Sequence, residues 1–261
     1  MHGYSQFRII STSDIVGSPE AVRAASAPPL TRRNGTGVGV PAVLPKGQPG
    51  GFWIRALNVS LATAALVVLS PIITLIALAI KLSSSGPVFY VQTRVGMDRR
   101  DGALDVGDPE RRFHDLGGRP FSMYKFRTMH TSAERGTGPV WARPNDGRVT
   151  RVGKFLRRYR LDEVPQLWNV IRGDMNISGP RPERPTLVAY LSQEVEGYHL
   201  RHRVRPGITG WAQINQAYDT TIQSVRSKLM YDLDYVERRS VWFDVYIMLR
   251  TIPALLKKKG W

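Results

Sequence analysis

The sequence contains no cysteine in its 261 residues. A disulfide-stabilised scaffold, a zinc ribbon and a cysteine nucleophile are therefore excluded. Acidic residues are also scarce: 21 Asp and Glu stand against 37 Lys and Arg, giving a formal net charge of +16. This surplus favours an anionic partner, which is nucleic acid, anionic lipid or a phosphorylated substrate. The hydrophobic content of 42% excludes disorder throughout and suits one domain with or without appendages.

Residues 1–51 show no apolar period and are rich in Pro, Gly, Ser and Ala. We expect a disordered tail, too polar to be a secretory signal peptide. The Gly35–Gly39 run resembles a nucleotide-binding loop, but no expected strand precedes it and no expected helix follows it. The tail therefore carries no predicted site.

An apolar block without a charged residue runs from Ala56 to Ile80, with Arg55 and Lys81 at its ends. As one helix it would be roughly 37 Å long, which exceeds the ~30 Å hydrocarbon core of a bilayer. A buried core helix seldom runs this far without a charge. We therefore predict that the block inserts into a membrane.

Ser70-Pro71 lies past the middle of this block, and proline kinks or breaks a helix. Both flanks are basic, with six Lys and Arg against two Asp and Glu in residues 1–55, and 31 against 19 in residues 81–261. Neither flank is thereby marked as the outer one. A re-entrant helix over residues 52–82, broken at Ser70-Pro71, fits this pattern better than a straight span, which stays the alternative.

Residues 83–261 are expected to form a mostly helical α+β domain with a small β element. Short β-like runs at Val88–Val91 and Phe121–Phe126 flank a charged surface excursion at Asp98–Arg119. Helical patterns follow around residues 151–171, 183–195, 221–236 and 240–258.

The last of these helices, within Ser240–Lys259, has an apolar stripe with Trp242 and Tyr246 and ends in three consecutive lysines before Trp261. This pattern is typical of a helix that lies in a membrane interface. An amphipathic helix packed on the domain core has the same pattern, and both descriptions can hold together.

The strongest chemical signal begins with five cations between Arg151 and Arg160, followed directly by Asp162-Glu163. Pro165 suits the first turn of a new helix and Gly173 its end. Two carboxylates at a helix N-terminus beside arginines are expected to have a lowered pKa, next to a site that attracts phosphate. An ionised aspartate there can attack phosphorus or bind Mg²⁺. An acidic cap on a solvated helix is the structural alternative.

Three further segments add cations and stiff turns to this region. Arg181 stands between two prolines, which suits bidentate phosphate recognition. Lys125 and Arg127 fall at the end of an expected strand. Arg205–Gln213 is a second stiff turn, with an aromatic residue and an amide. A purely structural role is the alternative for each turn taken alone.

Five motifs now stand in order, and with the Pro-broken apolar helix they resemble the bacterial sugar transferase family. The motifs are Lys125–Met129, Leu161–Val170, Gly173–Met175 with Gly179–Pro182, Arg205–Asn215, and Tyr231-Asp232 with Ser240–Asp244. The resemblance covers about Phe52 to Ile252. Members of this family are monotopic polyprenyl-phosphate phosphoglycosyl transferases that begin exopolysaccharide, O-antigen or glycoprotein glycan assembly.

The resemblance implies a reaction and its partners. A UDP-sugar donates its sugar-1-phosphate to a polyprenyl phosphate such as undecaprenyl phosphate, UMP leaves, and a phospho-aspartate forms on the way. The implied cofactor is Mg²⁺, with Mn²⁺ as the alternative. The implied location is the cytoplasmic face of the bacterial inner membrane, with no nucleic-acid partner. The sugar, the pathway and the oligomeric state, a homodimer included, stay open.

The resemblance also assigns roles by position. Asp162 is the nucleophile, and Glu163 belongs with it to the Mg²⁺ site and to acceptor activation. The implied phosphate and donor ligands are Lys125, Arg127, Arg157, Arg181, Arg205 and Gln213, and the helix break matches Ser70 and Pro71.

The chain departs from the family pattern at three places. Arg160 stands where many relatives have a small residue, Gln216 where many have glycine, and Asp98–Arg119 is longer than in minimal members. No block of four upstream transmembrane helices is seen, so the chain resembles the small form of the family.

Three other functions compete with this interpretation. Nucleic-acid binding would account for the basic charge but not for the charge-free block, and the sequence contains no recognisable nucleic-acid-binding motif. A membrane scaffold would make Asp162 and Glu163 dispensable. A glycosyltransferase is suggested by Asp232-Leu233-Asp234, which resembles a metal-binding Asp-x-Asp, but that segment falls in a helical pattern with no nucleotide-binding α/β repeat before it.

Overall fold

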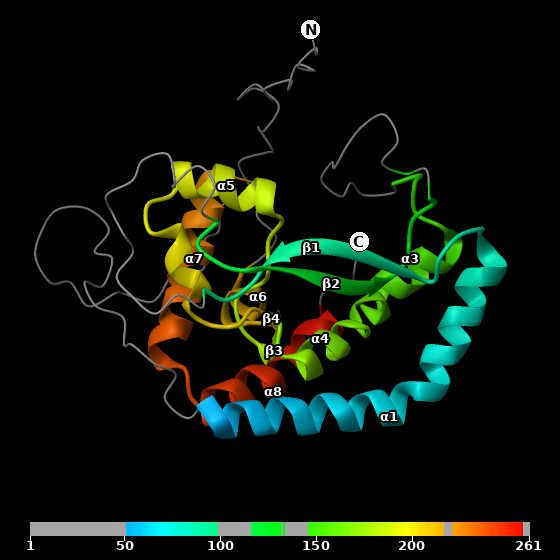
Figure 1. The fold of residues 1–261 in the computed structure, drawn as a ribbon, viewed down its shortest axis with the longest axis horizontal. Helices are drawn as coiled ribbons and strands as arrows, with labels where there is room; N and C mark the ends of the chain where they lie inside the picture. Colours follow the sequence, from blue (N-terminus) through cyan, green and yellow to red (C-terminus); the bar gives the residue numbers. More distant parts are fainter. Residues whose placement is uncertain (1–50, 99–115, 132, 134–145, 217–220, 258–261) are drawn as a thin grey trace, which may run out of the picture.

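The computed structural model describes residues 51–98, 116–131, 133, 146–216 and 221–257. This part of the chain is mostly helical with two small sheets, as the sequence predicts (Figure 1). The tail expected at 1–51 falls almost wholly outside the described residues. The elements are α1 (Gly51–Ser83), β1 (Phe89–Val95), β2 (Pro120–Phe126), α3 (Arg151–Arg158), η3 (Leu161–Glu163), α4 (Gln166–Arg172), β3 (Asn176–Ser178), α5 (Pro185–Glu194), η4 (Tyr198–Arg203), β4 (Gly207–Thr209), α6 (Trp211–Asn215), α7 (Ile222–Arg238) and α8 (Val241–Lys257).

The apolar block forms a single helix, α1, that contains Pro71 and bends into two arms (Figure 1). Proline cannot donate to the carbonyl four residues earlier, which is that of Val67. The hydroxyl of Ser70 donates to this carbonyl instead, at 2.8 Å. Pro71 therefore kinks the helix without ending it, and the predicted break is a bend in a continuous helix.

Both arms of α1 pack against the rest of the protein. In the first arm Ala62 is fully buried and joins a small core with Val170 and Met175. In the second arm Ile76 and Ile80 join another core with Phe126 and Leu156. The two ends of the helix therefore return to the same folded unit, on either side of the bend.

Polar side chains fix the first arm at one point. Arg55 donates to the carbonyls of Val170 and Ile171 in the last turn of α4, where a cation is favourable. The buried Asn58 accepts a hydrogen bond from the backbone N–H of Ile177 in β3. These contacts join α1 to the segment that follows the predicted Asp-Glu pair.

The outer surface of α1 is apolar and exposed. Phe52, Val68, Leu75 and Leu82 are among its large exposed side chains. Within the described residues it is the one helix that is long and apolar enough to cross a membrane. This agrees with the predicted insertion.

Strands β1 and β2 form an antiparallel hairpin in which Phe89 faces Phe126 and Val95 faces Pro120. Both lie where the sequence predicts strands, while residues 99–115 of the charged excursion between them fall outside the described part. The second sheet was not predicted: β3 and β4 are parallel, three residues each, with Ser178 opposite Thr209.

The largest core lies under α5, η4, α7 and α8. Helices α5, α7 and α8 match predicted helical regions, whereas the 3₁₀ helix η4 was not predicted. Helix α8 contributes Phe243 and Ile247 to this core. Its other face leaves Trp242, Leu249 and Ile252 mostly exposed. Helix α8 is therefore packed on the domain and still presents an apolar outer face. The lysine side chains at its end and Trp261 lie outside the described residues.

Candidate active site

The Asp-Glu pair lies on a short turn that separates two helices. Thr150 caps α3 by accepting a hydrogen bond from the N–H of Gly153, and the helix ends at Arg158. Arg160 then takes a left-handed conformation with φ of 54°, which L residues seldom adopt. This conformation breaks the helix predicted over 151–171. Asp162 and Glu163 therefore lie on the 3₁₀ turn η3 and not in the first turn of α4.

The end of α4 follows the prediction. Pro165 directly precedes the first helical residue, and Gly173 ends the helix with φ of 88°. Only glycine takes this conformation without strain. The last carbonyls of the helix accept hydrogen bonds from Arg55, and the Gly173 carbonyl accepts one from the side chain of Arg205.

Glu163 is buried between two cations. Its Oε1 accepts hydrogen bonds from Lys125 Nζ at 3.1 Å and from Arg181 Nη2 at 3.0 Å. Burial alone would raise the pKa of Glu163, but the charges of Lys125 and Arg181 lower it well below its usual range. Glu163 is therefore ionised at neutral pH and holds both cations at the site.

Asp162 lies in a different environment. Its carboxylate is partly buried and makes no hydrogen bond or ion pair within the described residues. Burial, with the neighbouring charge of Glu163, raises its pKa despite the nearby Lys125, Arg157 and Arg181. The lowered pKa predicted for the pair is thus confirmed for Glu163 and wrong for Asp162. Two adjacent carboxylates in opposite environments are suited to different tasks.

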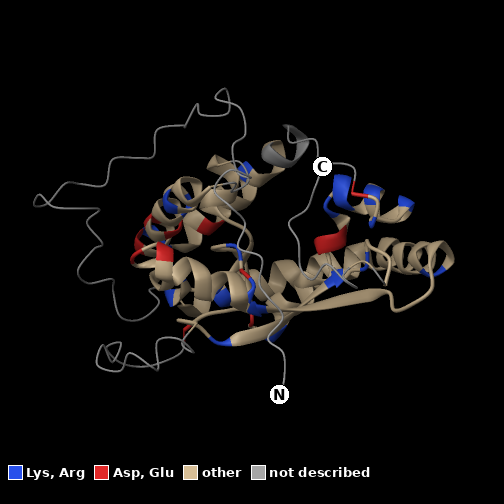
Figure 2. Ribbon diagram, turned by 90° about the horizontal axis from the view of Figure 1, so that it is seen from above, with Lys and Arg blue, Asp and Glu red and all other residues tan. Residues whose placement is uncertain are grey.

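Arg157 reaches the site from α3. Its Nε donates to the hydroxyl of Thr128 at 2.9 Å, and its charge acts on Asp162. Helix α3 approaches Thr128 closely because Gly153 has no side chain, and a Cβ at that position would overlap the Thr128 carbonyl. Figure 2 shows that Lys and Arg residues line α3 beside this part of the molecule.

A buried ion pair supports Arg181 from behind. Arg201 and Asp232 lie 2.7 Å apart, each almost fully buried. Arg201 also donates to the backbone carbonyl of Arg181 at 2.9 Å. Asp234, the other member of the Asp-x-Asp, accepts from the indole of Trp211 and from Arg238. Both aspartates, which lie on α7, therefore make structural contacts with neighbouring side chains.

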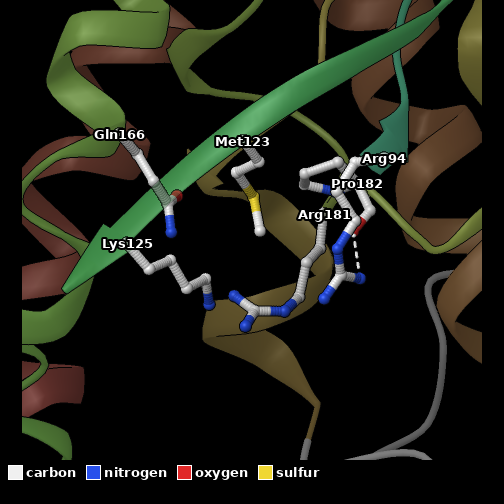
Figure 3. A pocket seen from close by; sticks show the side chains of 6 residues that line it. All are labelled: Arg94, Met123, Lys125, Gln166, Arg181 and Pro182. Atoms are coloured by element: carbon white, nitrogen blue, oxygen red, sulfur yellow. Dashed lines mark hydrogen bonds between the residues drawn. The ribbon is translucent and has the colours of Figure 1, made fainter. Parts of the chain in front are cut away.

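A narrow cavity lies between β2, α4 and the Arg181 turn, and in this conformation its lining side chains leave no room for a water molecule. Figure 3 shows the side chains that line it, and Lys125 and Arg181 extend toward each other across it. Arg94, Met123, Lys125, Gln166, Arg181 and Pro182 form its lining.

Two lining residues were not singled out from the sequence. Arg94 donates to the carbonyl of Pro182 at 3.0 Å and pairs with Glu183, and burial lowers its pKa to about 10. Gln166 is 2% exposed. Its position directly after the Asp-Glu-Val-Pro run was the signal available in the sequence.

The other residues assigned by resemblance have different contacts. Arg127 is buried and donates to the carbonyls of Ser84 and Ser85, both at 2.7 Å, so it binds the end of α1. Arg205 donates to Gly173, and Gln213 donates to the carbonyl of Ile208. The structure thus brings Lys125, Arg157, Asp162, Glu163 and Arg181 together and places these three residues in supporting contacts.

The profile of the bacterial sugar transferase family matches residues 50–258, which is most of the chain. The chain belongs to the bacterial sugar transferase family. The resemblance stated from the motifs is therefore confirmed.

Three relatives illustrate the range of this sugar transferase family. The chain is 44% identical over 200 residues to the UDP-glucose:undecaprenyl-phosphate glucose-1-phosphate transferase of Escherichia coli (strain K12), covering 76% of this chain and 39% of that protein. It is 40% identical over 209 residues to the UDP-N-acetylgalactosamine-undecaprenyl-phosphate N-acetylgalactosaminephosphotransferase of Aeromonas hydrophila, covering 80% and 45%. It is 37% identical over 212 residues to the exopolysaccharide production protein PSS of Rhizobium leguminosarum bv. phaseoli, covering 79% and 96%. The chain spans less than half the length of the first two relatives.

The carboxylates on η3 can be compared with what a divalent metal ion requires. In the part of the chain that the structure describes, no three His, Asp or Glu residues lie close enough to hold a metal ion by themselves. Magnesium is usually held by one or two carboxylates together with substrate phosphates. Asp162 and Glu163 meet that requirement, because Glu163 Oε2 and both Asp162 oxygens have no hydrogen-bond partner among the described residues.

Proposed function

We propose that the protein transfers a sugar-1-phosphate from a UDP-sugar to a polyprenyl phosphate such as undecaprenyl phosphate, releasing UMP. The observation that carries this proposal is the pair of carboxylates on η3, where Asp162 is unpaired and Glu163 holds two cations. The names of the relatives support UDP-sugars and undecaprenyl phosphate as substrates. The name of one relative supports a role in exopolysaccharide production.

The cations of the site are suited to a diphosphate. Three cations act on Asp162: Lys125 from β2, Arg157 from α3 and Arg181 from the turn after β3. They can therefore neutralise the negative charge of a bound diphosphate from several sides. Catalysis of phosphoryl transfer depends mainly on positioning the reacting groups and neutralising their negative charge. Without these cations, an anionic nucleophile would be repelled by an anionic donor.

The transfer then proceeds in two displacements. A carboxylate oxygen of Asp162 attacks the β-phosphorus of the donor, the bond from that phosphorus to the bridging oxygen breaks, and UMP leaves with the electron pair. A phosphate oxygen of the polyprenyl acceptor attacks the same phosphorus, and the bond to Asp162 breaks. The carboxylate is regenerated, and the product is a sugar diphospholipid.

Mg²⁺, or Mn²⁺ in its place, would be held by Asp162 and Glu163 together with phosphate oxygens of the donor. When bound, the ion supplies positive charge at the diphosphate. Lys125 and Arg181 keep Glu163 ionised for this task, since the carboxylate could not bind a cation in its protonated form.

The exposed apolar surface supports a monotopic placement on the cytoplasmic face of the inner membrane. Large exposed apolar or aromatic side chains lie on α1, α3, α4 and α8, including Phe155, Tyr159, Trp168 and Trp242. The two arms of α1 return to one folded unit, which a re-entrant helix would do and a straight span would not. The site on η3 would then lie at headgroup height, within reach of a lipid phosphate.

UMP release by purified protein in nanodiscs tests the proposal. Mg²⁺, undecaprenyl phosphate and a panel of UDP-sugars are supplied to the wild type and to Asp162→Asn. We expect turnover with one UDP-sugar in the wild type and none in the variant, which should remain folded and bound to the membrane. The donor alone should release about one UMP per enzyme and label the protein. Strict dependence on both substrates would contradict the covalent route, and silence across the panel would contradict the donor class.

A further inference from the structure

Gln166 is a buried polar side chain without a partner. It is 2% exposed, and within the described residues its side-chain amide makes no hydrogen bond, although the amide atoms border the cavity and are not fully enclosed. Polar groups on a nearly buried side chain are usually hydrogen-bonded in proteins. An amide kept in this state next to a reaction centre indicates that its partner arrives with a ligand.

The amide is directed into the cavity beside the carboxylates. Figure 3 shows the Gln166 side chain extending into the space that Lys125 also enters. Gln166 is the first residue of α4, so the rigid helix fixes its backbone while the side chain lines the cavity. In this conformation the space between the lining side chains is too narrow to hold a water molecule, so a ligand group enters it only when those side chains move apart.

We propose that the Gln166 amide hydrogen-bonds a hydroxyl group of the sugar that is transferred, and so helps to select the donor. This inference rests on the proposed function. The cavity already presents Arg94, Lys125 and Arg181, which are matched to phosphate oxygens. Phosphate only accepts hydrogen bonds, whereas an amide and a sugar hydroxyl each donate and accept. A neutral amide among three cations therefore fits the uncharged part of the donor.

The arrangement also gives a reason for discrimination between sugars. A site that hydrogen-bonds a substrate hydroxyl rejects an analogue that lacks it, because the buried polar group is then left unpaired. Removing the amide should therefore weaken the natural donor and relax the preference against the matching deoxy-sugar. It should leave contacts to the two phosphates and the uridine unchanged.

Binding of UDP and of the UDP-sugar measured side by side tests the assignment. Titrations are made in the Asp162→Asn background to prevent turnover, using UDP alone and UDP-glucose or UDP-N-acetylgalactosamine, whichever the wild type converts. Gln166→Leu and Gln166→Met are compared with Gln193→Leu, the same change on the exposed surface of α5. We expect the Gln166 variants to weaken the UDP-sugar about 10-fold and UDP less than 2-fold. Retained UDP binding also shows that they are folded.

The outcomes separate this inference from the proposed function. Equal weakening of UDP and UDP-sugar would overturn it in favour of a phosphate contact or a structural role, as would unchanged binding of both. If Asp162→Asn binds UDP-sugar and the wild type releases UMP while the Gln166 variants behave as Gln193→Leu does, only the inference fails. A wild type that neither binds nor converts any UDP-sugar overturns both.

Discussion

The buried pair of Arg201 and Asp232 allows a sharp test of how the site is supported. Asp232→Asn keeps the size of the side chain but removes the negative charge that lies in direct contact with the buried guanidinium of Arg201. The side chains of Arg201 and Asp232 are only 1% and 2% exposed, so water cannot solvate the guanidinium once its partner is removed. Removing one partner of such a pair costs about 3–5 kcal/mol. At about 2–4 °C per kcal/mol for a domain of this size, the Tm should fall by about 6–20 °C.

Thermal unfolding in detergent, followed by circular dichroism, measures the loss. Asp234→Asn is the matched control, because its carboxylate is partly exposed on α7 and an asparagine can still accept from Trp211. We expect this control to stay within about 1 kcal/mol of the wild type. The double variant Arg201→Met with Asp232→Leu should recover most of the stability, since no charge is left buried.

Activity separates support from chemistry in the same proteins. The double variant loses the hydrogen bond from Arg201 to the Arg181 carbonyl, so its UMP release should stay low although it is stable. If Asp232 and Asp234 instead bound a metal ion, Asp232→Asn would change the requirement for Mg²⁺ and not the unfolding temperature. If Asp232→Asn unfolded at the wild-type temperature and only its requirement for Mg²⁺ rose, the structural explanation would be refuted.

Three further outcomes are expected. Arg127→Met should lower stability by about 2–4 kcal/mol by leaving carbonyls at the end of α1 unpaired, with the donor KM unchanged; a raised KM at wild-type Tm would restore its assignment as a donor ligand. Burial raises the pKa of Asp244 to about 6. The folded state therefore holds this proton more tightly, and the free energy of unfolding should fall by up to about 3 kcal/mol as pH rises from about 4 to 6. Asp244→Asn should remove this slope in denaturant titrations, and an equal slope in both proteins would contradict the assignment. Because the chain has no cysteine, Phe52→Cys and Ser85→Cys can each be labelled alone. Both should react with an impermeant maleimide from the same side of the membrane, and labelling from opposite sides would establish a straight span.

Secondary structure could be predicted from the sequence where apolar residues repeat over a long enough segment to show a helical period. Helices α5, α7 and α8 repeat apolar residues over several turns, and Gly173 marks the end of α4 because only glycine suits that backbone conformation. The parallel pairing of β3 with β4 could not be read in the same way. Each strand has three residues, and their partners are set by tertiary contacts such as that of Ser178 with Thr209.

The site was predicted in its residue types and only partly in its electrostatics. Motif order pointed to Asp162 and Glu163, but their environments depend on which carboxylate the cations reach. Lys125 and Arg181 both bind Glu163, and Arg160 adopts a left-handed conformation that no propensity predicts. Arg127 carries the same charge as its neighbours in the motif yet faces α1, because side-chain direction is set by packing and not by composition.

The bonds from Arg55 to α4 have a consequence for how the protein is made. Arg55 and its partner Val170 are 115 residues apart. A ribosome that adds about 5–20 residues per second exposes α1 roughly 6–23 s before the residues that bind it exist. During that interval an apolar helix has only lipid or a chaperone to cover it. With the proposed membrane placement, this delay sets the order of biogenesis: α1 would enter the bilayer first, and the remaining domain would then fold against a helix already held there.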